Sequence, residues 1–540
     1  MTEGPADYLG FLRAKAPVAE AAGFDCDPAE VSPLLKPHQR DAVVWAVKGG
    51  RRGLFQSFGL GKTVQQIEIL RLVLAKAGGG RGLIVAPLGV RQEFIRDAAM
   101  LGVPIRFVRR IEDCAADGLH LTNYETVRDG KLDPAHFVAA SLDEASVLRG
   151  FGGTKTFREF MRLFEPVRWR FLATATPAPN EFIELLAYAA FLGVMDVGQA
   201  KTRFFRRDSE KADRLVPHPH KETEFWLWVA SWGLFLQRPS DLGHSDAGYD
   251  LPPLDVRWHE IPTDHSGAGA ERDGQGRLFR NAAIGVSEAA GEKRESLDAR
   301  IARLLAIRAE DPSAHRIIWH DLEAERHAIE RAIPGVSSVW GAQDLEARER
   351  TIVDFSEGRI AELAAKPVIA GSGCNFQRHC AWAVFLGIGF KFNDFIQAIH
   401  RIQRFLQQRP VRIDLIYTEA EREVRRQLEA KWARHGELVA NMTRIIREYG
   451  LADAALAGQL ARSIGVVRRE AAGEGWRCIH ADCVEETRGL PSDSVDLVVT
   501  SIPFSTQYEY TPSYNDFGHT DDDRHFFRQM DFLTPELLRV

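Results

Sequence analysis

The chain has 540 residues, of which 45% are hydrophobic and 27% charged, and its formal net charge is −6 at pH 7. This length exceeds what one hydrophobic core usually organises, so we expect roughly two to four domains of ordinary globular composition. The small negative charge excludes an overall basic field, and any nucleic-acid contact must therefore use local basic surface.

Two further features limit the cellular context. There is no run of about eighteen apolar residues, and the N-terminus lacks the basic-then-apolar pattern of a secretory signal. The six cysteines include no C-x-x-C pair, so zinc and disulfide frameworks are not expected. We predict a cytoplasmic protein with no membrane partner.

From about residue 34 to 190, short apolar runs alternate with amphipathic, helix-like stretches such as VRQEFIRDAAM and KTFREFMRLF. Strand–helix alternation predicts a parallel sheet with its chemistry at the carboxyl ends of the strands. The predicted strands are GLIVAPL (82–88), HLTNYE (120–125), FVAASLDEAS (137–146) and RWRFLATATP (168–177).

A second α/β block begins near the proline-rich turn at residues 251–254, and residues 263–291 are predicted to contain a mobile loop. Residues 419–470 are almost entirely helix-compatible and suit a connector. The predicted strands of the second block are RIIWH (316–320), KPVIAGSG (366–373), AWAVFLGI (381–388) and VRIDLIYT (411–418).

The segment QSFGLGKTVQ contains the most informative pattern, G-x-G-K-T, between an apolar run and a helix-like run. Small residues let backbone N–H groups surround phosphates, a lysine reaches the terminal ones, and a hydroxyl holds Mg²⁺ where a helix begins. The complete pattern has glycine where this chain has Gln56, and the alternative is a glycine turn followed by an exposed lysine. The four residues concerned are Gly59, Gly61, Lys62 and Thr63.

Other positions suit phosphoryl transfer. Gln39, in LKPHQRDAV, can read an adenine edge with its amide. Asp143 and Glu144 follow an apolar run in SLDEAS, as a Walker B pair does. Asp143 would hold Mg²⁺, and Glu144 would orient or deprotonate the attacking water. A solvated acidic pair at a strand end is the alternative.

The downstream segment QAIHRIQRFLQ provides Gln397, Arg401 and Arg404. Arginines three residues apart share one helical face, so both guanidiniums can point at one anion. They can act as arginine fingers that spread the charge developing on a γ-phosphate. The alternative is a basic, solvated helix face.

The ordered set LKPHQ, FGLGKT, LIVAPL, LTNYE, LDEAS, TATPAPN, GSGCNFQ and QAIHRIQRFLQ resembles the superfamily 2 helicases and translocases, closest to their Swi/Snf-like branch. The resemblance covers roughly residues 34–425. It implies an α/β fold in which two RecA-like lobes clamp ATP and Mg²⁺ between them, with nucleic acid running across both.

The resemblance also implies roles for individual residues. Gln39 falls in the glutamine motif, Lys62 and Thr63 in motif I, and Asp143 and Glu144 in motif II. Motif III, which couples ATP state to nucleic-acid grip, contains Thr174 and Thr176; motif V contains Gly373 and Asn375; motif VI contains Gln397, Arg401 and Arg404.

The chain departs from the family at Gln56 and at LDEAS, where a histidine often replaces the serine. The family's long insertions for nucleosome handling are absent from this sequence, which favours a compact phage-like or bacterial motor. Because this branch usually tracks along duplex DNA without unwinding it, we expect a DNA translocase. An RNA or single-strand helicase and a non-translocating, ATP-driven DNA clamp are the alternatives.

Candidate DNA contacts are few. Arg91 and Gln92, after the GLIVAPL strand, and the hydroxyls of motif III can reach phosphates. RFFRRD (203–208) is a basic-aromatic cluster, for which a partly buried helix with a solvated charged face is the alternative.

Near the C-terminus, DSVDLVVTSIPFS is a predicted strand ending in a tight turn with an aromatic residue. It resembles the [DNS]-P-P-[YFW] motif of DNA methyltransferases that modify the amino group of cytosine (N4) or adenine (N6). Ser501 would accept a hydrogen bond from the base, Phe504 would stack on the flipped base, and Pro503 would stiffen the turn. Ile502 replaces the first proline, and an inert strand–turn is the alternative.

No glycine-rich turn for S-adenosylmethionine occurs beyond Gly475. In one permuted branch of these enzymes that turn follows the catalytic motif, so we expect a truncated, partial Rossmann-like methyltransferase fragment that does not methylate by itself. A motor joined to a methyltransferase would suit restriction–modification or phage defence, with a possible nuclease or defence-system partner. The expected domains are an N-terminal extension (1–33), an ATP-binding lobe (34–245), a second lobe (246–425), a helical connector (426–474) and the methyltransferase fragment (475–540).

Overall fold

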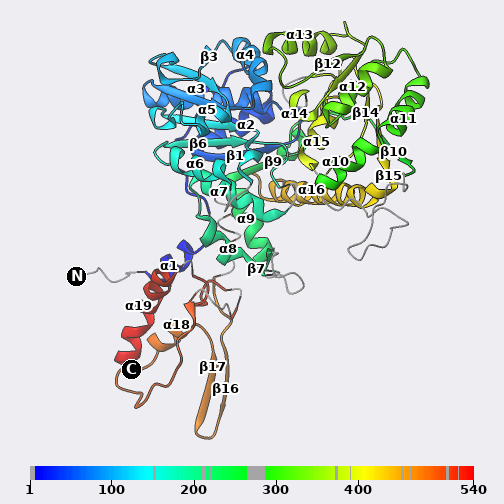
Figure 1. The fold of residues 1–540 in the computed structure, drawn as a ribbon. Coiled ribbons are helices and arrows are strands. Elements are labelled where there is room, and N and C mark those ends of the chain that lie inside the picture. The colour runs from blue at the N-terminus through cyan, green and yellow to red at the C-terminus, as the bar shows by residue number, and fades with distance from the viewer. Residues whose placement is uncertain are drawn as a thin grey trace.

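The protein consists of two α/β lobes side by side and a smaller C-terminal region beside the N-terminal helix (Figure 1). The computed structural model describes residues 7–16, 18–149, 154–178, 181–207, 215–218, 221–263, 286–370, 375–389, 391–451, 455–456, 458, 460, 464–505, 510–511, 513–520 and 522–540. Among these residues, no helix is both long and apolar enough to cross a lipid bilayer.

The first lobe is built on a seven-stranded parallel sheet in the order β3-β4-β2-β5-β6-β1-β9. Because the strands are parallel, their carboxyl ends meet at one edge, and β5, β6 and β1 are neighbours there. The strands are β1 (Arg51–Gln56), β2 (Arg81–Val85), β3 (Ile105–Phe107), β4 (Gly118–Thr122), β5 (Ala139–Asp143), β6 (Trp169–Ala173) and β9 (Gly233–Leu236).

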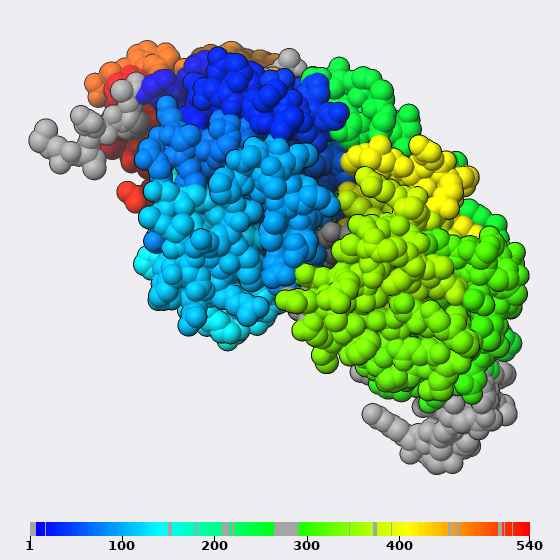
Figure 2. Space-filling model, turned by 90° about the horizontal axis from the view of Figure 1, so that it is seen from above, coloured from blue at the N-terminus to red at the C-terminus, as the bar shows by residue number. Residues whose placement is uncertain are grey.

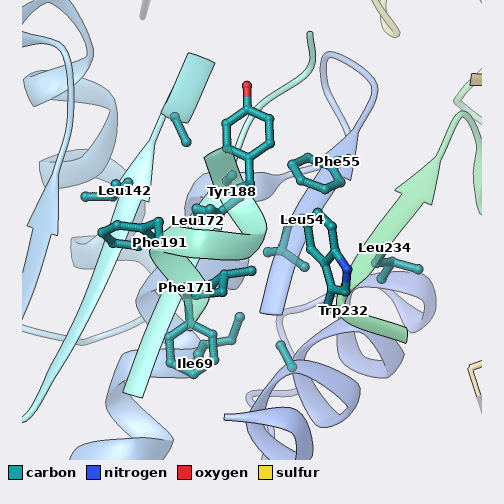
Figure 3. Packing of buried hydrophobic residues seen from close by; sticks show 14 of the residues in the cluster. Leu54, Phe55, Ile69, Leu142, Phe171, Leu172, Tyr188, Phe191, Trp232 and Leu234 are labelled. Carbon is teal, nitrogen blue, oxygen red and sulfur yellow. The ribbon is translucent and has the colours of Figure 1, made fainter. Parts of the chain in front are cut away.

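Helices pack against the apolar strands of this sheet to form its core (Figure 3). Phe55 of β1 lies between Tyr188 and Trp232, with ring centroids 5.4 and 5.9 Å away. The helices are α2 (Pro37–Gly49), α3 (Lys62–Ala77), α4 (Arg91–Met100), α5 (Tyr124–Arg128), α6 (Lys155–Phe164), α7 (Leu185–Leu192), α8 (Val197–Phe204) and α9 (Glu222–Trp232), with a small antiparallel hairpin of β7 (Phe205–Arg207) and β8 (Leu215–Pro217) after α8.

The second lobe has a six-stranded parallel sheet in the order β10-β15-β14-β11-β13-β12. These two parallel sheets confirm the predicted α/β fold with two lobes. The strands are β10 (Leu254–Ile261), β11 (Arg316–Trp319), β12 (Ser337–Val339), β13 (Glu362–Ala365), β14 (Trp382–Phe385) and β15 (Val411–Thr418). The helices are α10 (Val286–Glu295), α11 (Leu297–Ala309), α12 (Glu323–Ala332), α13 (Leu345–Ser356), α14 (Pro367–Ala370) and α15 (Phe392–Ile399).

Helix α16 (Arg422–Tyr449) runs beneath both lobes (Figure 1). Its 28 residues span about 42 Å at 1.5 Å per residue. Val424 and Leu428 near its start belong to the core of the second lobe, whereas Leu438 and Met442 belong to the core of the first. This single helix therefore ties the two lobes together on the side opposite α13.

The predicted strand KPVIAGSG is wrong. The sheet position is filled by the preceding residues, Glu362–Ala365, and Pro367–Ala370 form helix α14. Proline cannot donate to a strand ladder, but it suits the first turn of a helix, which explains the difference. Residues 371–373 of this prediction, and residues 264–285 of the predicted mobile loop, lie outside the described residues.

The predicted strand DSVDLVVTSIPFS is also wrong, because none of its residues is part of a strand. Leu497 and Val499 are 76% and 85% exposed. A strand needs a neighbouring strand for its backbone hydrogen bonds, and none of the sheets of the described residues includes this segment. The N–H groups of Asp493, Ser494 and Val495 bond instead to the carbonyls of Arg539 and Val540. The elements of this region are an antiparallel hairpin of β16 (Arg469–Gly473) and β17 (Trp476–His480), with helices α18 (Cys483–Arg488) and α19 (Asp523–Arg539).

The C-terminal region is held by the opposite end of the chain, since helix α1 (Tyr8–Ala14) packs against α19. Lys15 is 1% exposed, and its Nζ donates to the carbonyls of Tyr514 and Asp516 at 2.8 and 3.0 Å and to Gln529 Oε1 at 2.5 Å. The N-terminal and C-terminal residues thus form one packed unit.

This unit also contacts the first lobe, at a buried ion pair that belongs to that lobe. Arg203 on α8 donates to Glu224 on α9 at 3.0 Å and to the carbonyl of Lys15. Burial alone would raise the pKa of Glu224, but Arg203 and His519 outweigh it and lower the pKa to about 2. Arg203 of the RFFRRD cluster is therefore engaged within the protein, whereas Arg206 and Arg207 are exposed.

Candidate nucleotide site

The phosphate-loop pattern lies where β1 ends and α3 begins. Gly59 and Gly61 have φ angles of +88° and +83°, a backbone region that favours glycine. A Cβ at Gly59 would collide with the ring of Phe405 from the second lobe, and one at Gly61 would collide with the Gln39 amide. Both glycines are therefore required by backbone conformation and by close packing.

Lys62 is the first residue of α3 and points back into this loop. Its Nζ donates to the carbonyl oxygens of Gln56 at 2.7 Å and Ser57 at 3.1 Å. Desolvation in the enclosed site lowers the pKa of Lys62 to about 8, against the opposing effect of Glu144 and Asp143. The ammonium group is thus poorly solvated and suited to an anionic ligand.

The acidic pair follows β5, next to the loop. Asp143 accepts a hydrogen bond from Gln66 Nε2 at 2.8 Å, and Gln66 Oε1 accepts one from Ser141 at 2.7 Å. Burial and the neighbouring Glu144 raise the pKa of Asp143 to about 7. Sequence analysis missed Gln66, although two consecutive glutamines after K-T, on an otherwise apolar helix, were a detectable signal.

Glu144 and the first hydroxyl of motif III are in direct contact. The Oε1 atom of Glu144 accepts hydrogen bonds from Thr174 at 2.9 Å and from Ser146 at 2.8 Å. Thr176 donates its hydroxyl across the lobe boundary to Asn393 Oδ1. The predicted coupling residues of motif III therefore lie at the acidic pair, and one of them contacts the second lobe.

Residues from both lobes line one cavity of about 230 Å³. The lobes meet along the boundary between blue-to-cyan and green-to-yellow atoms in Figure 2. From the first lobe the lining includes Gly59, Gly61, Lys62, Thr63, Asp143 and Glu144, and from the second lobe Asn375, Arg401, Arg404 and Phe405. The structure thus brings the lysine and the two arginines to one place.

The arginines sit in a region poor in water. Arg404 Nη1 donates to Asn375 Oδ1. Burial, reinforced by the nearby Arg401, lowers the pKa of Arg404 to about 10. Gln397 instead lines an adjoining cavity of about 840 Å³, which also includes Glu144, Asn375 and Asn393.

Two other predicted residues have less direct positions. Gln39 uses both ends of its amide within the protein, donating to the Leu60 carbonyl at 3.0 Å and accepting from the Lys36 N–H at 2.9 Å. Its adenine contact stays a prediction, and the amide keeps one N–H and one lone pair for it. Gly373 lies outside the described residues.

Arg91 and Gln92, the predicted phosphate contacts, form a polar contact between the lobes. Arg91 Nη2 donates to both carboxylate oxygens of Glu349 on α13, at 3.1 and 3.2 Å, and Gln92 donates to the same carboxylate at 3.2 Å. The carboxylate of Glu349 thus accepts hydrogen bonds from the two side chains that were expected to contact DNA phosphates.

The donor set fits Mg²⁺ held jointly with phosphates. Thr63 and Asp143 both line the smaller cavity. Within the described ranges, no group of three histidine, cysteine or acidic side chains could hold a metal by itself. Mg²⁺ commonly takes one or two protein oxygens and completes its shell with phosphates and water, which is what one hydroxyl and one carboxylate allow.

Ser501, Pro503 and Phe504 lie outside the helices and strands of the C-terminal region and line neither of these two cavities. Phe504 is 58% exposed. Among the described residues from 464 onward, the strand followed by glycines is β16, with Gly473 and Gly475, and this turn leads into the antiparallel strand β17 and not into a helix, so these residues do not fit S-adenosylmethionine.

No protein-family model matches the chain. Among curated proteins, it is 23% identical over 419 residues to "Putative protein p41" of Acyrthosiphon pisum secondary endosymbiont phage 1, covering 68% of this chain and 88% of that protein. Among solved structures, it is similar to the Sulfolobus solfataricus SWI2/SNF2 ATPase core in complex with dsDNA, with 16% identity and a TM-score of 0.37, covering 80% of this chain and 98% of that one. These similarities are distant, so function must be inferred from the site.

Proposed function

We propose that this protein hydrolyses ATP between its two lobes and uses the cycle to move along duplex DNA. The observation that carries the proposal is the shared cavity, in which Lys62 of one lobe and Arg401 and Arg404 of the other surround Asp143 and Glu144. Cations from two bodies around an acidic pair are what a Mg²⁺-bound triphosphate requires.

The size of the cavity supports a cycle of opening and closing. At about 230 Å³ it is smaller than the roughly 300–1,000 Å³ of ordinary small-molecule pockets. Separation of the lobes would open this cavity to a nucleotide, and their return would bring the arginines to the phosphates. Lobe motion of this kind is the step that can be converted into movement on DNA.

Each side chain then has a role. Lys62 binds the terminal phosphates, and Glu144 orients or deprotonates the attacking water. Mg²⁺, held by Thr63 and Asp143, would neutralise charge on the phosphate oxygens. Arg401 and Arg404 stabilise the charge of the transition state, and the contact between Thr174 and Glu144 links motif III to hydrolysis.

The experiment compares ATP turnover with duplex DNA, single-stranded DNA and RNA. We expect duplex DNA to stimulate most, Lys62→Ala to abolish turnover, and Glu144→Gln to retain ATP while hydrolysis stalls. Stimulation by RNA or single strands alone would favour the helicase alternative and contradict the proposal.

Movement is tested by displacing a triplex-forming strand placed at increasing distance along the duplex. Lag times that grow with distance support translocation, whereas an absence of distance-dependent lag would favour an ATP-driven clamp. The preference for duplex DNA rests on the sequence resemblance, so both measurements are needed.

The S-x-P-F sequence at 501–504 supports a second proposal, that the C-terminal region belongs to a DNA amino-methyltransferase. A motor carrying such a domain suits restriction–modification or phage defence. The described residues do not fit S-adenosylmethionine, and no methylation step is assigned to them. The stacking role is tested by comparing the affinities of the wild-type protein and of Phe504→Ala for DNA with an extrahelical base. Equal affinities would contradict the stacking role.

A further inference from the structure

Glu144 is held by a chain of hydrogen bonds that begins in the first lobe and passes through the second. The hydroxyl of Thr176 donates to Asn393 Oδ1. Asn393 Nδ2 donates to Ser146 Oγ at 3.5 Å, and Ser146 Oγ donates to Glu144 Oε1 at 2.8 Å. Every donor in this chain leads toward the carboxylate, an arrangement in which hydrogen bonds reinforce one another.

Thr174 closes the chain into a ring. Its hydroxyl accepts from the backbone N–H of Thr176 at 3.2 Å and donates to Glu144 Oε1 at 2.9 Å. Four members of the ring belong to the first lobe, and Asn393 is the member from the second. Removing Asn393 therefore breaks the ring at the lobe boundary and leaves the first-lobe contacts in place.

Asn393 moves with the predicted arginine fingers. It lies at the start of α15, one helical turn before Gln397, so the two share a helix face, and both line the larger cavity with Glu144. The chain continues from α15 to Arg401 and Arg404. Closure of the second lobe therefore brings Asn393 and the arginines to the first lobe together.

Glu144 needs such support because its backbone is unusual. Its φ angle of +52° lies in the left-handed region, which is strained for a non-glycine residue and persists only where the surroundings hold it. Both side-chain hydrogen bonds reach Oε1. A catalytic water is then oriented by Oε2, whose direction depends on how firmly Oε1 is fixed.

We propose that Asn393 is a positioning residue for Glu144, which makes hydrolysis depend on closure of the lobes. This inference rests on the proposed ATPase function. With the lobes apart, Ser146 and Thr176 lose their shared partner, and the carboxylate keeps its two hydrogen bonds but is held less firmly. ATP is therefore retained without hydrolysis until the second lobe has closed, which limits turnover in the open state.

The test measures kcat and KM for ATP in the full chain at saturating duplex DNA. Asn393→Ala should lower kcat about ten- to a hundredfold, the range expected when a reacting group is misplaced by about 1 Å. KM for ATP and the thermal midpoint should stay at the wild-type values, because Asn393 does not line the cavity that holds Lys62. Asn441→Ala, on α16 and outside the ring, is the matched control and should match wild type.

A double-mutant cycle with Ser146→Ala separates positioning from general destabilisation. Because both changes break one ring, the double variant should be no slower than the slower single variant. Additive losses, a wild-type kcat in Asn393→Ala, or a loss confined to KM would overturn the role of Asn393.

The wild-type protein and Lys62→Ala are measured alongside these variants. If the wild-type protein does not hydrolyse ATP, or if Lys62→Ala hydrolyses it equally fast, the proposed ATPase function fails and this inference fails with it. Turnover that depends on Lys62 but not on Asn393 overturns this inference alone.

Discussion

Arg404→Ala tests the site where the two lobes meet. Arg404 lines the same cavity as Lys62, and burial together with Arg401 lowers its pKa only to about 10, so it remains cationic at neutral pH. A guanidinium in a site with little water interacts with a phosphate more strongly than a solvated one. Its removal should therefore affect the chemical step more than nucleotide binding.

The magnitude follows from that placement. An arginine finger contributes about 10³–10⁵ in kcat, which corresponds to roughly 4–7 kcal/mol of barrier at 1.36 kcal/mol per tenfold. Arg401 lines the same cavity and can supply part of the missing charge. We therefore expect a loss near the lower end, roughly a thousandfold.

The assay is single-turnover ATP hydrolysis at saturating duplex DNA, with nucleotide affinity measured separately by a fluorescent ATP analogue. Arg409→Ala is the matched control, since Arg409 is exposed and donates to the His379 carbonyl. Surface substitutions usually cost no more than about 0.5 kcal/mol, roughly twofold in rate. Turnover by Arg404→Ala at the level of this control would refute the finger role and leave Arg404 as a structural partner of Asn375.

Three further changes test the contacts around the site. Glu349→Gln removes the charge that holds Arg91, so the affinity for duplex DNA should rise in fluorescence anisotropy titrations. Unchanged or weaker binding would show that Glu349 does not compete with DNA phosphates for Arg91. Lys15→Met leaves two buried acceptors and a partly buried one without their donor, at about 1–3 kcal/mol for each buried acceptor, and should speed proteolysis of the C-terminal region. Lys48→Met, at an exposed ion pair, is the control and should lower the free energy of unfolding by less than about 1 kcal/mol. Equal protease resistance of the two variants would show that the contacts of Lys15 do not stabilise the C-terminal region. Met442→Ala should lower the free energy of unfolding by about 2–5 kcal/mol in denaturant melts, whereas a change within about 0.5 kcal/mol would show that α16 is not packed on the first lobe.

The sequence by itself determined the local features. Apolar runs bounded by turns predicted β2, β4, β5 and β6 of the first sheet and β11, β14 and β15 of the second, because burial on both faces of a parallel sheet imposes that pattern. G-x-G-K-T was recognisable because the local backbone conformation requires glycine, as the positive φ angles of Gly59 and Gly61 show. KPVIAGSG and DSVDLVVTSIPFS were predicted wrongly because a short apolar run suits a strand, a helix or an unpaired segment equally well.

Only the tertiary structure decided which residues meet across the lobes. The placement of Arg404 beside Lys62, and the contacts of Asn393 and Glu349 with the first lobe, join positions far apart in the chain. No local periodicity encodes such contacts, because they depend on how two separately formed sheets pack and on the helix, α16, that ties them together. Gln66 is an intermediate case. A polar residue on an otherwise apolar helix could be noticed in the sequence, but its hydrogen bond to Asp143 could be found only from the folded structure.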